Sequence, residues 1–321
     1  MNGMTAYEDQ TSSSINALLD KNAEKPYLRS FKVFISPSLS SRTVLQYLKN
    51  INKFMNDVHK PASELTFEDF TNYLDKNSSS TPSCQINIYS ALKKFSSYLA
   101  GREIISKDHM AQIPRPKFYE STETVNKRAN GFLTKSEIDK CLDEMWIHEF
   151  DLTLRARDRF LLLLLLNTGI RCSAVYKLNT SDIQQTETGQ HFFKVIEKEN
   201  KINTSYFSDT LEEAYEDWMK YKNRDPVMRE QEALFVSRKG TRLAQKTINE
   251  VVTKYCSVNG KHITPHKLRA TYASLLYAKT HDVYFVQKAM NHSSPGVTER
   301  YIRGKDEDIN INVAKYMNEI F

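Results

Sequence analysis

The sequence predicts a mainly α-helical protein of two domains, with a small antiparallel β-sheet in the second domain. Three observations support this fold class. Apolar residues recur at helical spacing along most of the chain, the patch at 191–207 is rich in strand formers, and a polar stretch at 113–132 breaks the periodicity. A chain of 321 residues is long enough for two domains of ordinary size.

The first domain is predicted to be helical over 23–118, after a flexible, polar tail at 1–22. The segments 40–58 and 83–100 carry apolar residues three or four positions apart, which is typical of helices with one buried face. Thr66 and Asp69 lie three positions apart and predict the capping box of a further helix. The apolar positions of the two long segments are Val44, Tyr47, Leu48, Ile51, Phe54 and Met55, then Ile86, Tyr89, Leu92, Phe95 and Leu99.

A linker is predicted at 119–130, within the polar stretch that also contains two prolines. The second domain then occupies 131–321. It begins at a second capping box, formed by Thr134 and Glu137. The sequence therefore predicts that the second domain starts on a helix.

The β patch of the second domain is predicted to be a hairpin, because the strand-like segments 191–198 and 202–207 flank a short turn. The last segment, 305–321, is predicted to be a helix with one apolar stripe. That stripe consists of Val313, Tyr316, Met317 and Ile320.

Composition places the protein among ordinary globular chains. Its net charge of +6 permits nucleic-acid binding without establishing it. The longest apolar run, 160–166, is far too short to span a bilayer, and the N-terminus lacks the features of a secretory signal. We therefore expect a cytoplasmic protein with no membrane contact. The four cysteines form no CxxC pair, so neither a disulfide framework nor a zinc site is indicated.

One pair of residues suggests phosphate chemistry. Thr264 and Pro265 predict the start of a helix that carries His266 and Arg269 on one face. A helix start gathers unsatisfied N–H groups and the positive end of the helix dipole, both of which favour a phosphate group.

Four more residues could complete a phosphoryl-transfer site. Arg171 follows a glycine turn, Lys198 lies at the tip of the predicted hairpin, and His292 precedes another predicted helix start that leads to Tyr301. Two arginines can hold the non-bridging oxygens of one phosphate, a lysine can protonate a leaving oxygen, and a histidine can accept the proton of an attacking hydroxyl. Such neighbours are needed, because a tyrosine with a pKa near 10 is a poor nucleophile alone.

Each of these residues alone has a common structural explanation, and only the set is specific. His262 and His266 are four apart, like a metal-binding pair, but the predicted helix starts between them at Pro265, so they should not share a face. We therefore predict no metal ion and no other cofactor.

The set resembles the active site of the tyrosine recombinases, also called the phage integrase family. That family reads arginine, lysine, His-x-x-Arg, histidine or tryptophan, and then tyrosine. Two departures are Ala174, where the family often has glutamate, and Met290-Asn291 in place of Leu-Gly. The resemblance covers 23–321 and is closest to the compact, two-domain Xer-type enzymes. The matching residues are Arg171, Lys198, His266, Arg269, His292 and the nucleophile Tyr301.

The resemblance implies a helical core-binding domain joined to a tyrosine-recombinase catalytic domain. It implies site-specific cleavage and rejoining of double-stranded DNA through a 3′-phosphotyrosyl intermediate and a Holliday junction, carried out by a homotetramer on two duplexes. A covalent intermediate keeps the phosphodiester energy, so neither ATP nor metal is required. The family also implies that the helix at 305–321 docks on a neighbouring protomer, and that a directionality factor or a second recombinase could take part on nucleoid DNA.

Two alternatives use the same residues. One is relaxation of DNA in the manner of a type IB topoisomerase, and the other is a DNA-binding regulator with an idle site. For a recombinase, the first domain should contact DNA through the polar face of 83–100 and the start of 40–58. An ordinary solvated surface is the alternative interpretation of that polar face. The residues expected to make these contacts are Arg42, Thr43, Gln85, Lys93 and Lys94.

Overall fold

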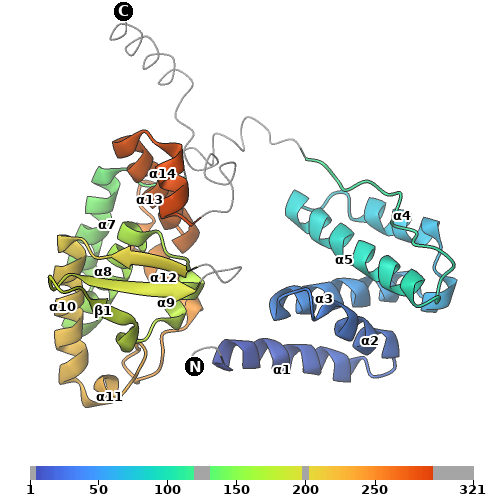
Figure 1. Cartoon of the computed structure of the whole chain (residues 1–321), viewed down its shortest axis with the longest axis horizontal. Helices are drawn as coiled ribbons and strands as arrows, with labels where there is room; N and C mark the ends of the chain where they lie inside the picture. Colours follow the sequence, from blue (N-terminus) through green and yellow to red (C-terminus); the bar gives the residue numbers. More distant parts are fainter. Residues whose placement is uncertain (1–4, 119–130, 197–201, 292–321) are drawn as a thin grey trace, which may run out of the picture. The chain divides into compact units, whose positions relative to one another are not determined.

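The structure, a computed structural model, describes residues 5–118, 131–196 and 202–291 (Figure 1). The chain divides into two compact units, residues 1–120 and 121–321. The predicted fold class is confirmed: helices dominate the described residues, and the strands among them form one three-stranded antiparallel sheet. Within these ranges, every helix is too short or too polar to cross a bilayer.

The first unit is a set of helices around one apolar core. The rings of Phe31 and Phe95 meet edge to face with centroids 5.2 Å apart, and those of Phe54 and Phe70 lie 5.0 Å apart. Its elements are α1 (Thr5–Lys21), α2 (Pro26–Ile35), α3 (Ser41–Val58), the 3₁₀ turn η1 (Ala62–Glu64), α4 (Phe67–Lys76) and α5 (Pro82–Gly101).

The apolar faces predicted for α3 and α5 pack into this core, where most of their members are buried. Tyr47 and Ile86 lie at the margins and are only half-buried. The capping box at the start of α4 is also confirmed, because the Thr66 N–H donates to Oδ2 of Asp69 at 2.8 Å. Local sequence signals therefore account for these helices.

The N-terminal segment differs from its prediction as a flexible tail. Residues 5–21 form helix α1, and the side chains of Ile15 and Leu19 are 4% and 3% exposed in the core of the first unit. α1 packs against α3. The physical reason is that two apolar residues four positions apart are enough to fasten a helix to a neighbouring apolar face, although the segment as a whole is polar.

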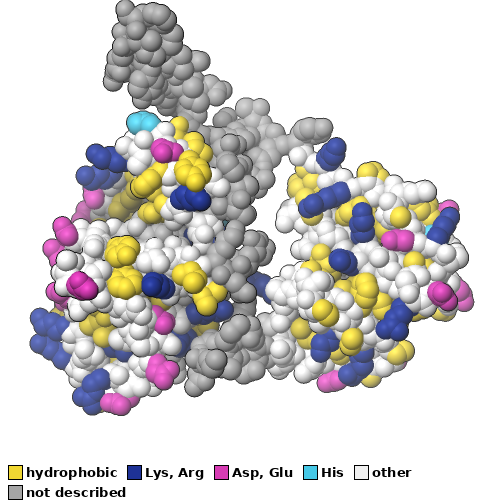
Figure 2. Space-filling view, in the orientation of Figure 1, with side chains coloured by type: hydrophobic (Ala, Val, Ile, Leu, Met, Phe, Trp, Pro, Cys, Tyr) yellow, Lys and Arg dark blue, Asp and Glu magenta, His cyan; other side chains and the backbone are white. Residues whose placement is uncertain are grey.

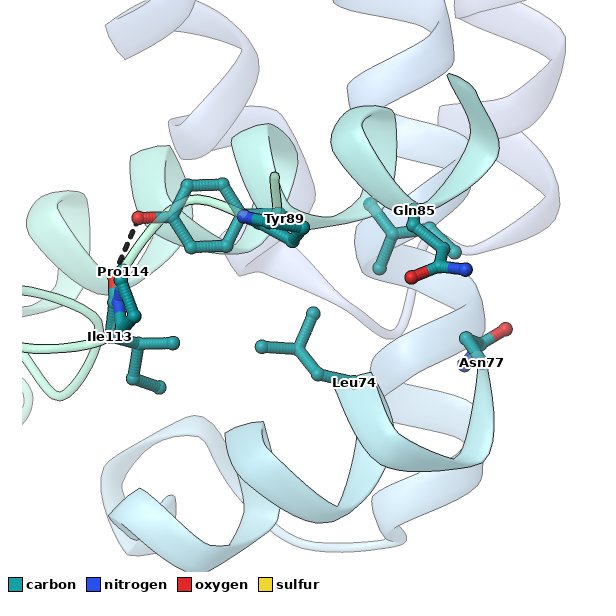
Figure 3. A pocket seen from close by; sticks show the side chains of 8 residues that line it. Leu74, Asn77, Gln85, Tyr89, Ile113 and Pro114 are labelled. Carbon is teal, nitrogen blue, oxygen red and sulfur yellow. Dashed lines mark hydrogen bonds between the residues drawn. The ribbon is translucent and has the colours of Figure 1, made fainter. Parts of the chain in front are cut away.

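The chain that leaves the first unit is held against α5. The Tyr89 hydroxyl donates to the carbonyl oxygen of Ile113 at 2.6 Å, and Pro114 follows (Figure 3). These residues line a small, largely apolar pocket together with Leu74 of α4. The stretch before the predicted linker therefore has a defined path over α4 and α5.

The second unit combines helices with the sheet. Its first helix begins at the predicted capping box, in which the Thr134 N–H donates to Oε2 of Glu137 at 2.9 Å. Its elements are α7 (Lys135–His148), α8 (Leu152–Thr168), α9 (Cys172–Lys177), η2 (Thr180–Asp182), β1 (Ile183–Gln185), β2 (His191–Ile196), β3 (Ile202–Tyr206), α10 (Asp209–Arg224), α11 (Pro226–Arg229), α12 (Gln245–Cys256), α13 (Pro265–Thr280) and α14 (Val283–Ala289).

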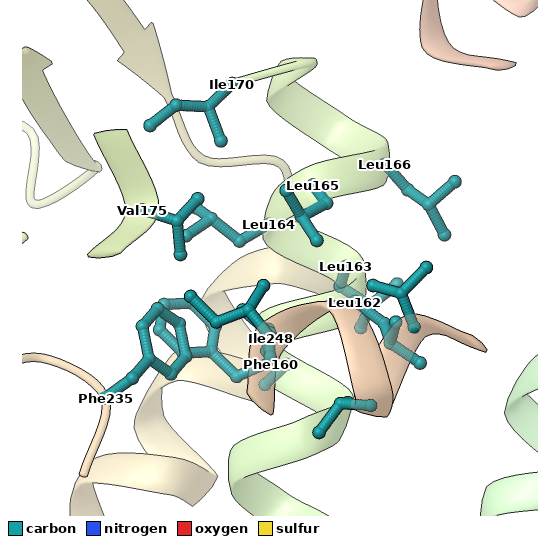
Figure 4. Packing of buried hydrophobic residues seen from close by; sticks show 14 of the residues in the cluster. Phe160, Leu162, Leu163, Leu164, Leu165, Leu166, Ile170, Val175, Phe235 and Ile248 are labelled. Atoms are coloured by element: carbon teal, nitrogen blue, oxygen red, sulfur yellow. The ribbon is translucent and has the colours of Figure 1, made fainter. Parts of the chain in front are cut away.

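Helix α8 is the centre of the second unit. Every side chain from Phe160 to Leu166 is buried, because α10 and α13 pack on this helix (Figure 4). Asp151 caps its start by accepting from the Thr153 N–H at 2.9 Å. The apolar run is thus a core helix, as its length predicted, and its end is a rigid point from which the next residues are positioned.

The predicted hairpin is confirmed as β2 and β3, which pair antiparallel with Ile196 opposite Ile202. The third strand, β1, pairs with the other edge of β2 and was not predicted, because three residues are too few to show a periodicity. Phe193 and Val195 of β2 point into the core. The sheet therefore fixes the two ends of the 197–201 connection, which lies outside the described residues.

Candidate active site

Arg171 lies at a sharp turn between two helices. α8 ends at Gly169, which adopts the left-handed conformation (φ +58°), and Ile170 is buried behind the turn. Arg171 then occupies the N-cap position of α9. The core thereby fixes the backbone of Arg171 and leaves its side chain half-buried at the surface.

His266 and Arg269 lie in the first turn and a half of α13, where Pro265 is the first residue, as predicted. Arg269 is 3% exposed. Its guanidinium donates to the carbonyl oxygen of Gly169 and, at 2.5 Å, to that of Met290, which follows α14. A buried cation thus joins three segments of the chain. His266, at the helix start, keeps part of its surface in solvent, while neighbouring groups partly enclose its imidazole.

Tyr272, one helical turn after Arg269, makes a second contact with the glycine turn. A Cβ placed on Gly169 would collide with the ring of Tyr272. The turn therefore requires glycine both for its positive φ and for the close approach of this ring. Sequence reasoning missed Tyr272, although its i, i+3 spacing from Arg269 places the two on one face.

The pKa of His266 indicates that His266, Arg171 and Arg269 lie in one site. Partial burial of the imidazole and then the positive charges of Arg269 and Arg171 lower the pKa of His266 below its usual 6.5. Both arginines therefore lie close enough to act on this ring. The lowered pKa favours the neutral form of His266, which can accept a proton, beside two guanidinium cations that suit a phosphate group.

The other three candidates lie outside the described residues. Lys198 belongs to the connection between β2 and β3, and His292 and Tyr301 follow the last described residue, Asn291. The carbonyl bound by Arg269 belongs to Met290, two positions before His292. The participation of Lys198, His292 and Tyr301 in the site stays a prediction.

Among the described residues, no group of three or more His, Cys, Asp or Glu side chains has the arrangement of a metal site. His262 and His266 lie on either side of the α13 start, as predicted.

The residues expected to contact DNA from the first unit lie on α3 and α5. Arg42, Lys93 and Lys94 are exposed, and the Thr43 N–H donates to Oγ of Ser40, the N-cap residue of α3, at 3.4 Å. Gln85 instead donates to the carbonyl oxygens of Ser78 and Ser80, both at 2.7 Å. On the face visible in Figure 2, basic side chains of this unit are scattered among acidic and apolar ones.

Comparison with known proteins identifies the class. Residues 131–308, more than half of the chain, match the model of the phage integrase family. A relative, tyrosine recombinase XerC of Caldanaerobacter subterraneus subsp. tengcongensis (strain MB4), is 28% identical over 251 residues, which cover 77% of this chain and 66% of that protein. The chain thus spans about two thirds of this relative's length.

Two solved structures share the fold. XerH recombinase bound to palindromic difH substrate, a post-cleavage complex, superposes with a TM-score of 0.67 at 20% identity, covering 86% of this chain and 78% of that one. A lambda integrase tetramer bound to a Holliday junction gives 0.65 at 16% identity, covering 90% and 77%.

The chain therefore belongs to the phage integrase family, the class of tyrosine recombinases. Within that class it is a site-specific recombinase similar to the Xer proteins. These relatives favour recombination over topoisomerase activity and over regulation by an idle site.

Proposed function

We propose that the chain recombines double-stranded DNA through a covalent phosphotyrosyl intermediate formed by Tyr301. The observation that carries this proposal is the meeting of Arg171, His266 and Arg269, where partial burial and then the charges of the two guanidiniums lower the pKa of the imidazole. A site with two guanidinium cations and a neutral base suits a phosphodiester that is about to gain negative charge.

In the first step the Tyr301 oxygen attacks a backbone phosphorus atom and gives its proton to His266. The bond from phosphorus to the 5′ oxygen breaks, and Lys198 protonates the leaving oxygen. Arg171, Arg269 and His292 stabilise the charge on the non-bridging oxygens. The DNA is left with a 3′-phosphotyrosyl link and a free 5′-hydroxyl.

In the second step a 5′-hydroxyl of the partner duplex attacks the phosphotyrosyl bond and displaces Tyr301. One exchange gives a Holliday junction, and a second exchange resolves it. Because each phosphodiester is exchanged for another, the reaction needs no ATP, and the cations of the site make a metal ion unnecessary. A homotetramer on two duplexes supplies the four tyrosines, and the lambda integrase tetramer on a Holliday junction supports this assembly.

The remaining assignments complete the proposal. Residues 23–118 serve as the core-binding domain, 119–130 as the linker and 131–321 as the catalytic domain. The segment 305–321 docks on a neighbouring protomer. Lys93 and Lys94 contact DNA phosphates with Arg42, Thr43 and Gln85, and the enzyme acts on nucleoid DNA in the cytoplasm, with a directionality factor or second recombinase as a possible partner.

The test begins by incubating the protein with fragmented genomic DNA and sequencing the ends that become covalently attached. A duplex built on the recovered site, with a nick beside the cleavage position, should trap a covalent protein–DNA band, because the cleaved fragment diffuses away. Wild type should give this band and Tyr301→Phe should not. A band of equal intensity from the phenylalanine variant would assign the nucleophile to another residue.

A plasmid with two copies of the site separates the alternatives. Deletion or inversion of the intervening DNA is the result expected of a recombinase. Relaxation of supercoils without rearrangement would indicate topoisomerase activity, and binding without any covalent adduct would indicate a regulator.

A further inference from the structure

The helix that carries His266 and Arg269 is tied to the beginning of its own unit. The Leu133 N–H donates to Oγ1 of Thr271 at 3.0 Å, in the buried interior. Lys261, in the loop between α12 and α13, donates from Nζ to the carbonyl oxygen of Phe132 at 3.0 Å. The first residues after the predicted linker are therefore fastened both to α13 and to the loop that precedes it.

Glu137 is the centre of this attachment. Glu137 is 7% exposed, and its carboxylate accepts from Nζ of Lys261 at 2.7 Å and from Nδ2 of Asn259 at 3.1 Å. It also accepts from the Thr134 N–H, as the capping box requires. One carboxylate thus caps α7 and holds the α12–α13 loop, and a buried charge with this many donors has one favourable position.

The start of α13 depends on such external support. Thr264 occupies its N-cap position, but its side chain makes no capping hydrogen bond. The loop before it also contains Asn259 and Gly260 in the left-handed conformation, which departs from regular secondary structure. The bonds made by Lys261 therefore fix the loop from which α13 begins.

From these contacts we propose that Glu137 and Lys261 are positioning residues for the reaction: they hold the start of α13 so that His266 and Arg269 face Arg171. The proposal rests on the proposed function. Residues 132–134, which follow the predicted linker, contact the same groups. The proposal therefore also implies that these residues connect the linker to the active site.

A second ion pair in the same unit provides a matched control. Nζ of Lys254, in the last turn of α12, donates to Oε2 of Glu149 at the end of α7 at 3.0 Å, and the Tyr255 hydroxyl donates to the same oxygen at 3.0 Å. This pair joins the same two parts of the unit as Glu137 and Lys261. The hydrogen bonds among Glu149, Lys254 and Tyr255, however, reach neither residues 132–134 nor the α12–α13 loop.

The experiment measures single-turnover adduct formation on the nicked duplex together with DNA affinity. Glu137→Gln and Lys261→Met should each lower the adduct rate by about tenfold or more with Kd changed less than about twofold, since small misplacements of reacting groups cost rate more than binding. Lys261→Arg, which can still donate to both oxygens, should restore most of the rate. The control variants Glu149→Gln and Lys254→Met should keep the wild-type rate.

Hydrogen exchange of the DNA-free protein gives a readout that does not depend on catalysis. Amides of residues 261–270 should exchange faster in Glu137→Gln and Lys261→Met than in the two control variants. Equal adduct rates and equal exchange in all four variants would overturn the positioning role while leaving the proposed function intact. Absence of an adduct from the wild type would overturn the proposed function itself, and the positioning role with it.

Discussion

The guanidinium of Arg269 donates a hydrogen bond to the carbonyl oxygen of Gly169, the residue at which the central helix α8 ends. A second bond, at 2.5 Å, goes to the carbonyl oxygen of Met290. Arg269 therefore has two tasks. It places a positive charge in the site, and it fixes the turn that presents Arg171 as well as the chain that leads to His292.

Replacing Arg269 by lysine should impair both tasks. A single ammonium on a flexible chain cannot reproduce the planar, forked donor set, and a buried carbonyl left without its donor costs about 1–3 kcal/mol of unfolding free energy. We expect Arg269→Lys to lower stability by that amount in urea unfolding and to abolish most adduct formation. Arg229→Lys is the control, because Arg229 is exposed and pairs with Glu230 at the surface. Equal stability of the two variants would contradict the structural task.

Gly169→Ala should destabilise the second unit through two separable effects. The positive φ costs a non-glycine residue about 1–2 kcal/mol, and the new methyl group collides with Tyr272. Gly189→Ala isolates the first effect, because Gly189 also has a positive φ (+85°) but has open space around it. The unfolding free energy should therefore be highest for the wild type, lower for Gly189→Ala and lowest for Gly169→Ala.

A double variant tests the collision directly. Tyr272→Ala removes the ring, so combining it with Gly169→Ala should cost less than the two single losses added together. Strict additivity of the three urea-unfolding measurements would mean that Tyr272 does not approach Gly169.

The features that could be predicted from the sequence are those that depend on residues a few positions apart. The capping boxes Thr66–Asp69 and Thr134–Glu137 were predicted because both partners of each box lie within one helical turn. The helix at 5–21 was missed, because the segment is polar overall and its burial depends on the packing of residues such as Ile15 and Leu19 against other helices.

In the candidate site, too, the contacts between residues close in sequence could be predicted, and those between distant residues could not. His266 and Arg269 were predicted to share a helix face from their spacing, and the structure places them on α13. Arg269 meets Gly169 across 100 positions, and Lys261 meets Glu137 across 124. No local pattern encodes such pairs, since they follow from how α13 and its loop pack on the rest of the unit.

His266 should titrate below the usual histidine range. Burial and two neighbouring cations disfavour its protonated form, so we expect a pKa below 6.5 in a histidine-selective NMR titration, with the signal assigned from His266→Gln. Arg171→Gln removes one of these charges and should raise this pKa, though not fully to 6.5, because burial is the largest cause. Lys177→Gln, at the far end of α9, is the control and should leave the pKa unchanged.

The same shift has a consequence for stability. A histidine with a lowered pKa binds fewer protons in the folded state than in the unfolded chain, so its contribution favours unfolding as pH falls from 6.5 through the folded-state pKa. Wild type should therefore lose more stability over this window than His266→Gln, and the two curves should run parallel above pH 7. A larger loss in the glutamine variant would show that the pKa is raised instead.

Deleting residues 309–321 should separate DNA binding from assembly. The stripe of Val313, Tyr316, Met317 and Ile320 lies outside the described residues, and its four apolar side chains are suited to an apolar surface on another protomer. The truncated protein should bind a single site with nearly wild-type affinity in a gel-shift titration. It should form fewer tetrameric complexes on paired sites and give less recombinant product.

A point variant distinguishes docking on a neighbour from packing within one protomer. Met317→Asp introduces a charge into the stripe, and burying that charge without a partner is costly wherever the stripe packs. If the segment docks on a neighbour, thermal stability of the DNA-free monomer should be unchanged while tetramer formation falls. A lowered melting temperature of the monomer would mean that the segment packs on its own domain, and normal recombination by the truncated protein would exclude the docking role.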